Sequence, residues 1–135
     1  MRELTVEANM EHFDEVMAFV EEAFEEVGCR MKNLMQFTLA ADEIFTNICS
    51  YAYKDIPESG DELFGRVRIE VSENCLTMTD AGKPYNPLEK PDPDVTLDAE
   101  KRNIGGLGIF MVKNAMDEMH YEYKDGRNVL TMIRR

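Results

Sequence analysis

The sequence has few cysteines, few basic residues and no long apolar run. Its three cysteines, Cys29, Cys49 and Cys75, are far apart and form no CxxC pair, so neither a disulfide framework nor a zinc site is indicated. No apolar stretch approaches the ~18 residues that a membrane span requires, and the first 20 residues lack the pattern of a secretory signal. We therefore expect a cytoplasmic protein that does not act at a membrane.

Basic residues are outnumbered, with 15 Lys and Arg against 27 Asp and Glu and a formal net charge of −12. Nucleic acid binding needs a basic surface that displaces condensed counterions. The charge balance therefore argues against a nucleic acid partner. Many of the acids fall on one side of a predicted helix, where a solvated face is the simpler interpretation and a docking surface for a basic partner is the alternative: Glu11, Asp14, Glu15, Glu21, Glu22, Glu25 and Glu26.

The chain is long enough for one domain with a substantial core. Its 135 residues are 44% hydrophobic, which is typical of a globular protein. We predict a single domain over residues 1–135.

Hydrophobic periodicity predicts an α+β fold. Strands are expected near Leu4–Ala8, 67–71, 76–78, 121–124 and 128–133, and helices over His12–Val27, Lys32–Tyr53 and 109–119. The prolines between Gly82 and Asn103, with no sustained periodicity, indicate a long loop of the kind used as a lid. Because hairpins dominate, we expect a two-layer α/β sandwich whose mostly antiparallel mixed sheet is covered on one face by three helices.

Glu43 and Asn47 are one turn apart at the edge of the apolar stripe of the second predicted helix. A carboxylate there can take a proton from an attacking hydroxyl, and the amide oxygen can ligate Mg²⁺. The alternative is an ordinary polar helix edge.

Asp80 follows a predicted strand, and Gly82 comes two residues later. A glycine permits a close backbone approach that a side chain would prevent. The pair indicates either a simple turn or a carboxylate that accepts a hydrogen bond from the exocyclic amine of adenine.

The run Gly105-Gly106-Leu107-Gly108 directly precedes the third predicted helix. Free amides and the helix dipole at that point favour a phosphate. A Rossmann loop is excluded because a charged segment, not a hydrophobic strand, leads into the glycines, and a P-loop is excluded because Arg66 and Val67 stand where Lys and Ser or Thr are required.

Taken in order, these segments resemble the motifs of the GHKL ATPase superfamily, and within it those of the anti-sigma factor serine kinases. Leu39–Asn47 is similar to the N-box, Asp80–Pro87 to the adenine-binding box and Asn103–Ile109 to the phosphate box at the lid hinge. The closing stretch, from Met116–Met119 through Asn128–Met132, also resembles the end of the family. Many relatives have His four residues after the N-box Asn, where this chain has Tyr51.

The resemblance implies a Bergerat-type fold that binds Mg-ATP. It implies Glu43 as general base, Asn47 as magnesium ligand, Asp80 as adenine reader beside Gly82, and Thr131 as a further adenine contact. The amides of Gly105, Gly106, Leu107 and Gly108 would bind the phosphates, and Tyr85–Asn103 would form the ATP lid.

The expected function is that of a protein serine/threonine kinase. It would transfer the γ-phosphate of ATP to an anti-sigma-factor antagonist and would also bind a sigma factor. The alternative is a nucleotide-responsive module that binds such a regulator without phosphorylating it. The resemblance also implies a homodimer, which an exposed N-terminal strand could support.

Overall fold

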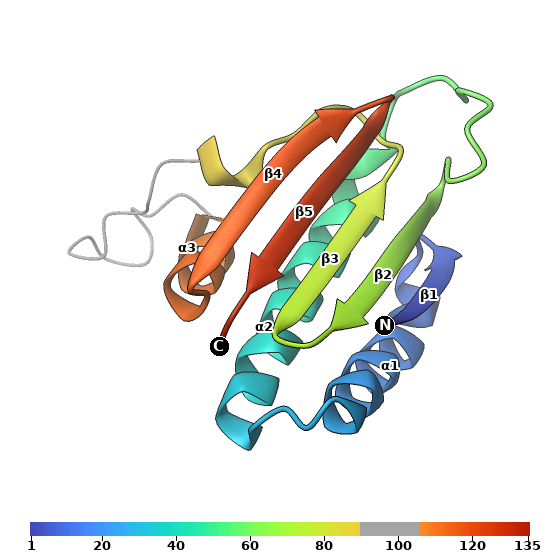
Figure 1. Ribbon diagram of the computed structural model, residues 1–135. Coiled ribbons are helices and arrows are strands. Elements are labelled where there is room, and N and C mark those ends of the chain that lie inside the picture. Colours follow the sequence, from blue (N-terminus) through green and yellow to red (C-terminus); the bar gives the residue numbers. More distant parts are fainter. Residues whose placement is uncertain (90–105) are drawn as a thin grey trace.

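The computed structural model describes residues 1–89 and 106–135 (Figure 1). The helices are α1 (Phe13–Glu26), α2 (Met31–Asn47) and α3 (Gly106–Ala115), with a π-helical turn, Ile48–Ala52, continuing α2. The strands are β1 (Arg2–Glu7), β2 (Arg66–Ser72), β3 (Cys75–Asp80), β4 (Glu118–Lys124) and β5 (Arg127–Ile133). Short 3₁₀ turns occupy Met10–His12 and Pro87–Glu89.

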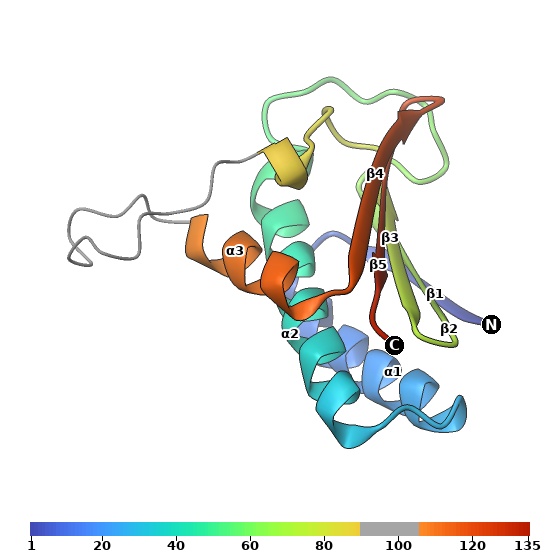
Figure 2. The ribbon, with the colours of Figure 1, turned by 60° about the vertical axis from the view of Figure 1, so that its left-hand side comes forward.

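The strands form one sheet in the order β1-β2-β3-β5-β4, and each neighbouring pair is antiparallel. Figure 2 shows this sheet nearly edge-on, with all three helices on one side of it. The two-layer α+β prediction is therefore confirmed. The expected mixed sheet is, within the described residues, antiparallel throughout.

The core lies between the helices and one face of the sheet. Strand β2 alternates buried Val67, Ile69 and Val71 with more exposed polar residues, as the period-two pattern predicts. Opposite them, α1 and α2 meet through Phe24 and Phe37, whose rings stack with centroids 4.1 Å apart and are fully buried. This packing holds α2 against the sheet. The C-terminal end of α2 therefore faces the C-terminal end of β3 and the N-terminal end of β5.

Both predicted hairpins are present. The β2–β3 turn places Asn74 at φ 60°, and the β4–β5 turn places Asp125 and Gly126 at φ 54° and 79°. Left-handed residues of this kind are common in two-residue hairpin turns, and in the β4–β5 turn both central residues adopt that conformation.

Two helix ends differ most from the prediction. The α-helix expected to reach Tyr53 ends at Asn47 and continues as the π-helical turn. The last helix ends at Ala115, and Met119 lies in β4, opposite Met132 of β5. Met119 fits both the helical and the strand spacing of apolar residues, and its pairing with β5 makes it part of a strand. Most of the predicted lid lies outside the described residues.

Candidate functional site

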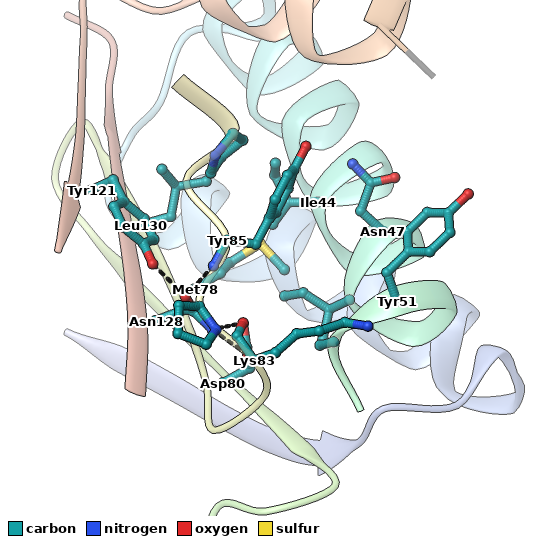
Figure 3. Close-up of a pocket in the computed structure, with 14 residues that line it drawn as sticks. Ile44, Asn47, Tyr51, Met78, Asp80, Lys83, Tyr85, Tyr121, Asn128 and Leu130 are labelled. Atoms are coloured by element: carbon teal, nitrogen blue, oxygen red, sulfur yellow. Dashed lines mark hydrogen bonds between the residues drawn. The ribbon is translucent and has the colours of Figure 1, made fainter. Parts of the chain in front are cut away.

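A cavity of about 400 Å³ lies between the C-terminal part of α2 and the sheet (Figure 3). Asp80 and Asn128 line it from β3 and β5, and Asn47 and Tyr51 line it from α2 and the π-helical turn. Tyr85, from the segment after β3, lies between them. The fold thus brings together two of the separated sequence motifs, the Asn47 motif and the Asp80 motif.

Asp80 is a buried carboxylate at the sheet side of the cavity, with 5% of its surface exposed. Its Oδ1 accepts hydrogen bonds from the Gly82 amide at 2.9 Å and from Asn128 Nδ2 at 3.0 Å. Burial raises the pKa of the carboxyl, and these two hydrogen bonds oppose that rise. With Oδ1 occupied twice, Oδ2 is the acceptor that remains for a donor group of a ligand.

Asn128 holds that carboxylate in place, although the sequence analysis did not select it. Its Nδ2 also donates to the Lys83 carbonyl at 2.9 Å, and its Oδ1 accepts from the Tyr85 amide at 3.1 Å and from the Tyr121 hydroxyl at 2.5 Å. Every hydrogen-bonding position of the Asn128 amide is thereby used. A polar residue in the inward-facing series 128, 130 and 132 was the signal that could have revealed it.

Thr131, which the resemblance implied as an adenine contact, lies elsewhere. It pairs with Thr77 of β3 and His120 of β4, whereas the buried residues of β5 are Asn128, Leu130 and Met132. Because side chains alternate along a strand, Thr131 points to the face of the sheet that carries no helices, away from the cavity. The structure places Asn128, and not Thr131, beside Asp80.

Position 82 requires a glycine because the backbone of Ala52 lies close to it. A Cβ added to it would lie 2.7 Å from the carbonyl carbon of Ala52, and the next amide, that of Lys83, donates to the Ala52 carbonyl at 2.9 Å. The predicted close approach is therefore present, and its partner is the π-helical turn of the protein itself. This contact joins the segment after β3 to the π-helical turn that follows α2.

Glu43 and Asn47 face the same side of α2, one turn apart, with Asn47 Nδ2 3.4 Å from Glu43 Oε1. Asn47 lines the cavity, and Glu43 lies beside it, against the first turn of α3. A Cβ added to Gly108 would overlap the Glu43 carboxylate. The glycine therefore allows the acid to approach the N-terminal end of α3.

The glycine-rich motif is described only in part. Gly106 is the first residue of α3, Leu107 is 40% exposed and Gly108 touches Glu43. Gly105 lies outside the described residues. The sequence placed this run before a helix that begins at Ile109, whereas α3 begins at Gly106, and its first turn lies beside Glu43.

A sequence model of the histidine kinase-like ATPase domain matches residues 6–134. The chain belongs to this family. The match confirms the resemblance to the GHKL superfamily that the three motifs indicated.

This histidine kinase-like domain is similar to several proteins named as kinases. It is 32% identical over 96 residues to the serine/threonine-protein kinase BtrW of Bordetella bronchiseptica, covering 70% of this chain and 66% of the relative. It is 26% identical over 107 residues to the serine-protein kinase RsbW of Listeria monocytogenes, covering 76% and 67%. The protein of the same name from Staphylococcus epidermidis is 26% identical over 144 residues, covering 98% and 84%. The chain thus spans about two thirds of the length of the first two relatives.

Asn47 is the residue of this histidine kinase-like domain whose side chain suits a magnesium ion. Within residues 1–89 and 106–135, no cluster of three or more His, Cys, Asp or Glu side chains forms a metal site. Asn47 directs its amide nitrogen toward Glu43, which leaves the amide oxygen for a cation. Magnesium in nucleotide sites takes few protein ligands besides the phosphates.

Among the helices within residues 1–89 and 106–135, none is both long and apolar enough to cross a bilayer.

Proposed function

We infer that this domain binds Mg-ATP in the cavity and acts as a protein serine/threonine kinase on an anti-sigma-factor antagonist. The observation that carries the proposal is the buried Asp80, which lines the cavity and whose Oδ1 already accepts two hydrogen bonds, so Oδ2 is the acceptor that we assign to a ligand. An ionised carboxylate accepts hydrogen bonds and donates none, so it suits the exocyclic amine of adenine. Guanine bound in the same orientation would present its carbonyl at that ring position, and the carboxylate would repel it. Family membership and the names of the relatives support the same reading.

The proposed phosphate end lies at the start of α3. The amides of Gly106, Leu107 and Gly108, together with that of Gly105, would donate to the phosphate oxygens, helped by the positive end of the helix dipole. Magnesium, when bound with ATP, would neutralise charge on the phosphates. Asn47 would hold that ion through its amide oxygen.

Glu43 is the proposed general base because it lies between Asn47 and the first turn of α3. In the transfer step, the serine oxygen of the substrate forms a bond to the γ-phosphorus. The bond from that phosphorus to the β–γ bridging oxygen breaks, its electron pair leaves with ADP, and the serine proton passes to the Glu43 carboxylate. A second role, sequestration of a sigma factor, belongs to the same proposal.

The alternative is a nucleotide-responsive module that binds a sigma factor or another regulator without phosphotransfer. The observation that favours it is Tyr51, which lines the cavity with 61% of its surface exposed where many relatives have His. Such a module needs Asp80 and the glycines but not Glu43.

Calorimetric titration with Mg-ATP, followed by transfer of a γ-label to a panel of purified anti-sigma-factor antagonists, tests both readings. Glu43→Gln keeps the size of the side chain and the acceptor for Asn47 and removes the base. We expect it to bind ATP within about threefold of the wild type and to lose about 10²-fold or more of the transfer rate. Wild-type binding of ATP and an antagonist without transfer would select the alternative, and no ATP binding at all would refute the nucleotide proposal.

A further inference from the structure

The hydroxyl of Tyr53 connects two segments that meet behind the cavity. It accepts a hydrogen bond from the amide of Ala81 at 2.9 Å. As a donor it lies 2.6 Å from the Arg66 carbonyl and 3.0 Å from the Leu63 carbonyl. Burial raises the pKa of Tyr53 to about 12, so the phenol retains its proton at neutral pH. Tyr53 does not line the cavity itself.

The first of these segments, residues 61–66, is anchored to the sheet. Asp61 forms two hydrogen bonds with Arg127, at 2.8 and 3.0 Å, and its Oδ1 accepts the Leu63 amide at 2.7 Å. Leu63 is buried. Arg127 directly precedes Asn128 in β5, so the carbonyls that face the Tyr53 hydroxyl are tied to the strand that also positions Asp80.

The second segment, residues 80–82, carries Asp80, the acid that lines the cavity. Ala81 lies between Asp80 and Gly82, and only 5% of its surface is exposed. The Gly82 amide is already committed to Asp80, and Gly82 is pressed against Ala52. The Ala81 peptide is therefore the link whose orientation sets where the Asp80 carboxylate points, and Tyr53 supplies its hydrogen-bond acceptor.

We propose that Tyr53 is a positioning residue for the base-binding end of the cavity, acting through the Ala81 amide without touching the ligand. The proposal rests on the proposed binding of ATP at Asp80. Removing the hydroxyl leaves the buried Ala81 amide without its acceptor, which frees the Asp80 turn to relax. The Leu63 carbonyl keeps its hydrogen bond from the Arg66 amide at 2.9 Å, so that segment stays in place. The ring can stay in place, because it packs edge-on against Phe64 with centroids 5.0 Å apart.

The variant Tyr53→Phe removes only the hydroxyl, and Tyr123→Phe is the matched control on an exposed ring of β4. Affinities for Mg-ATP and Mg-GTP are measured for both, because the two nucleotides share the triphosphate and differ at the base. We expect Tyr53→Phe to bind ATP about tenfold more weakly, from the loss of one or two hydrogen bonds, with GTP binding unchanged. Tyr123→Phe should match the wild type.

Amide hydrogen exchange of the ligand-free protein supplies a second measurement that needs no nucleotide. Tyr53→Phe should accelerate exchange at Ala81 and Gly82 and leave the β2 core amides unchanged. The proposal is overturned if ATP affinity stays within twofold, if ATP and GTP binding fall together with the melting temperature, or if the Ala81 amide exchanges as in the wild type. If the wild type itself binds no ATP, the proposed function fails, and the exchange rates still decide whether Tyr53 holds the turn.

Discussion

At the scale of single residues, Asp80 combines a binding role with a cost to the fold. Burial raises its pKa above the value of an unfolded chain. A carboxyl of this kind stabilises the fold when protonated, below the unfolded pKa, and this contribution is lost as pH rises through the raised pKa of the folded state. The folded protein is therefore less stable with Asp80 in its ionised, ligand-accepting form than with Asp80 protonated.

Asp80→Asn should separate these two effects. The amide oxygen can accept the same two hydrogen bonds from Gly82 and Asn128, while the nitrogen that replaces Oδ2 cannot accept from adenine. We expect the free energy of unfolding at pH 7 to equal or exceed that of the wild type, with the difference shrinking toward pH 4. ATP affinity should fall about tenfold to a hundredfold, the range for a lost hydrogen bond to a charged group. Denaturant titrations at both pH values and calorimetry measure this, and a less stable variant at pH 7 would contradict it.

The sequence predicted Asp80, Gly82, Glu43 and Asn47 as site residues because each belongs to a local motif with a fixed spacing, and the structure places all four in or beside one cavity. The sequence was insufficient to choose between Asn128 and Thr131. These residues are three apart on one strand, so they lie on opposite faces of the sheet, and the pairing of β5 with β3 determines which one reaches Asp80. Tyr53 was missed for a related reason, since its partners Leu63, Arg66 and Ala81 are 10 to 28 residues away.

At the scale of elements, hairpin turns and helix periods predicted most of the fold, while the junction after α2 did not follow from periodicity. The π-helical turn Ile48–Ala52 places Tyr51 and Ala52 at the cavity and lets Ala52 meet Gly82. Apolar spacing alone predicts that the α-helix continues through this stretch. Insertions of this kind occur often at functional sites, and contacts with other elements decide their position.

Gly82 and Gly108 join elements in different ways, and their alanine variants should differ accordingly. At Gly108 a methyl group meets the flexible end of Glu43, which can swing aside, and alanine favours the helix by about 1 kcal/mol over glycine. Gly108→Ala should therefore fold at least as stably as the wild type and lose phosphotransfer through the displaced acid. At Gly82 the methyl group meets the Ala52 backbone, so Gly82→Ala should lose about 1–3 kcal/mol of stability.

Thermal denaturation of both variants, combined with the γ-label transfer assay, checks this pair. Equal stability loss at both glycines would mean that Glu43 cannot move away from α3. Full transfer activity of Gly108→Ala would show that the position of the Glu43 carboxylate does not limit the reaction.

At the scale of the whole molecule, the net charge of −12 sets how stability responds to salt. Several ion pairs are largely exposed, such as Arg2 with Glu22 and Glu26 and Arg135 with Glu118. Exposed pairs contribute little to stability because water and salt screen them. Repulsion among the excess carboxylates, including those along α1, acts across the entire surface and favours the expanded, unfolded chain.

Raising NaCl from about 10 mM to about 150 mM shortens the screening length from about 30 Å to about 8 Å, so it should weaken this repulsion more than it weakens the ion pairs. We expect an increase in unfolding free energy on the order of 1 kcal/mol, or about 3 °C in melting temperature for a chain of this size. The same titration near pH 4.5, where Asp and Glu are partly neutralised, should show a much smaller increase. Sucrose at matched osmolality controls for general solute effects. A melting temperature that falls with salt at pH 7 would mean that the ion pairs, and not the repulsion, dominate the electrostatics of this fold.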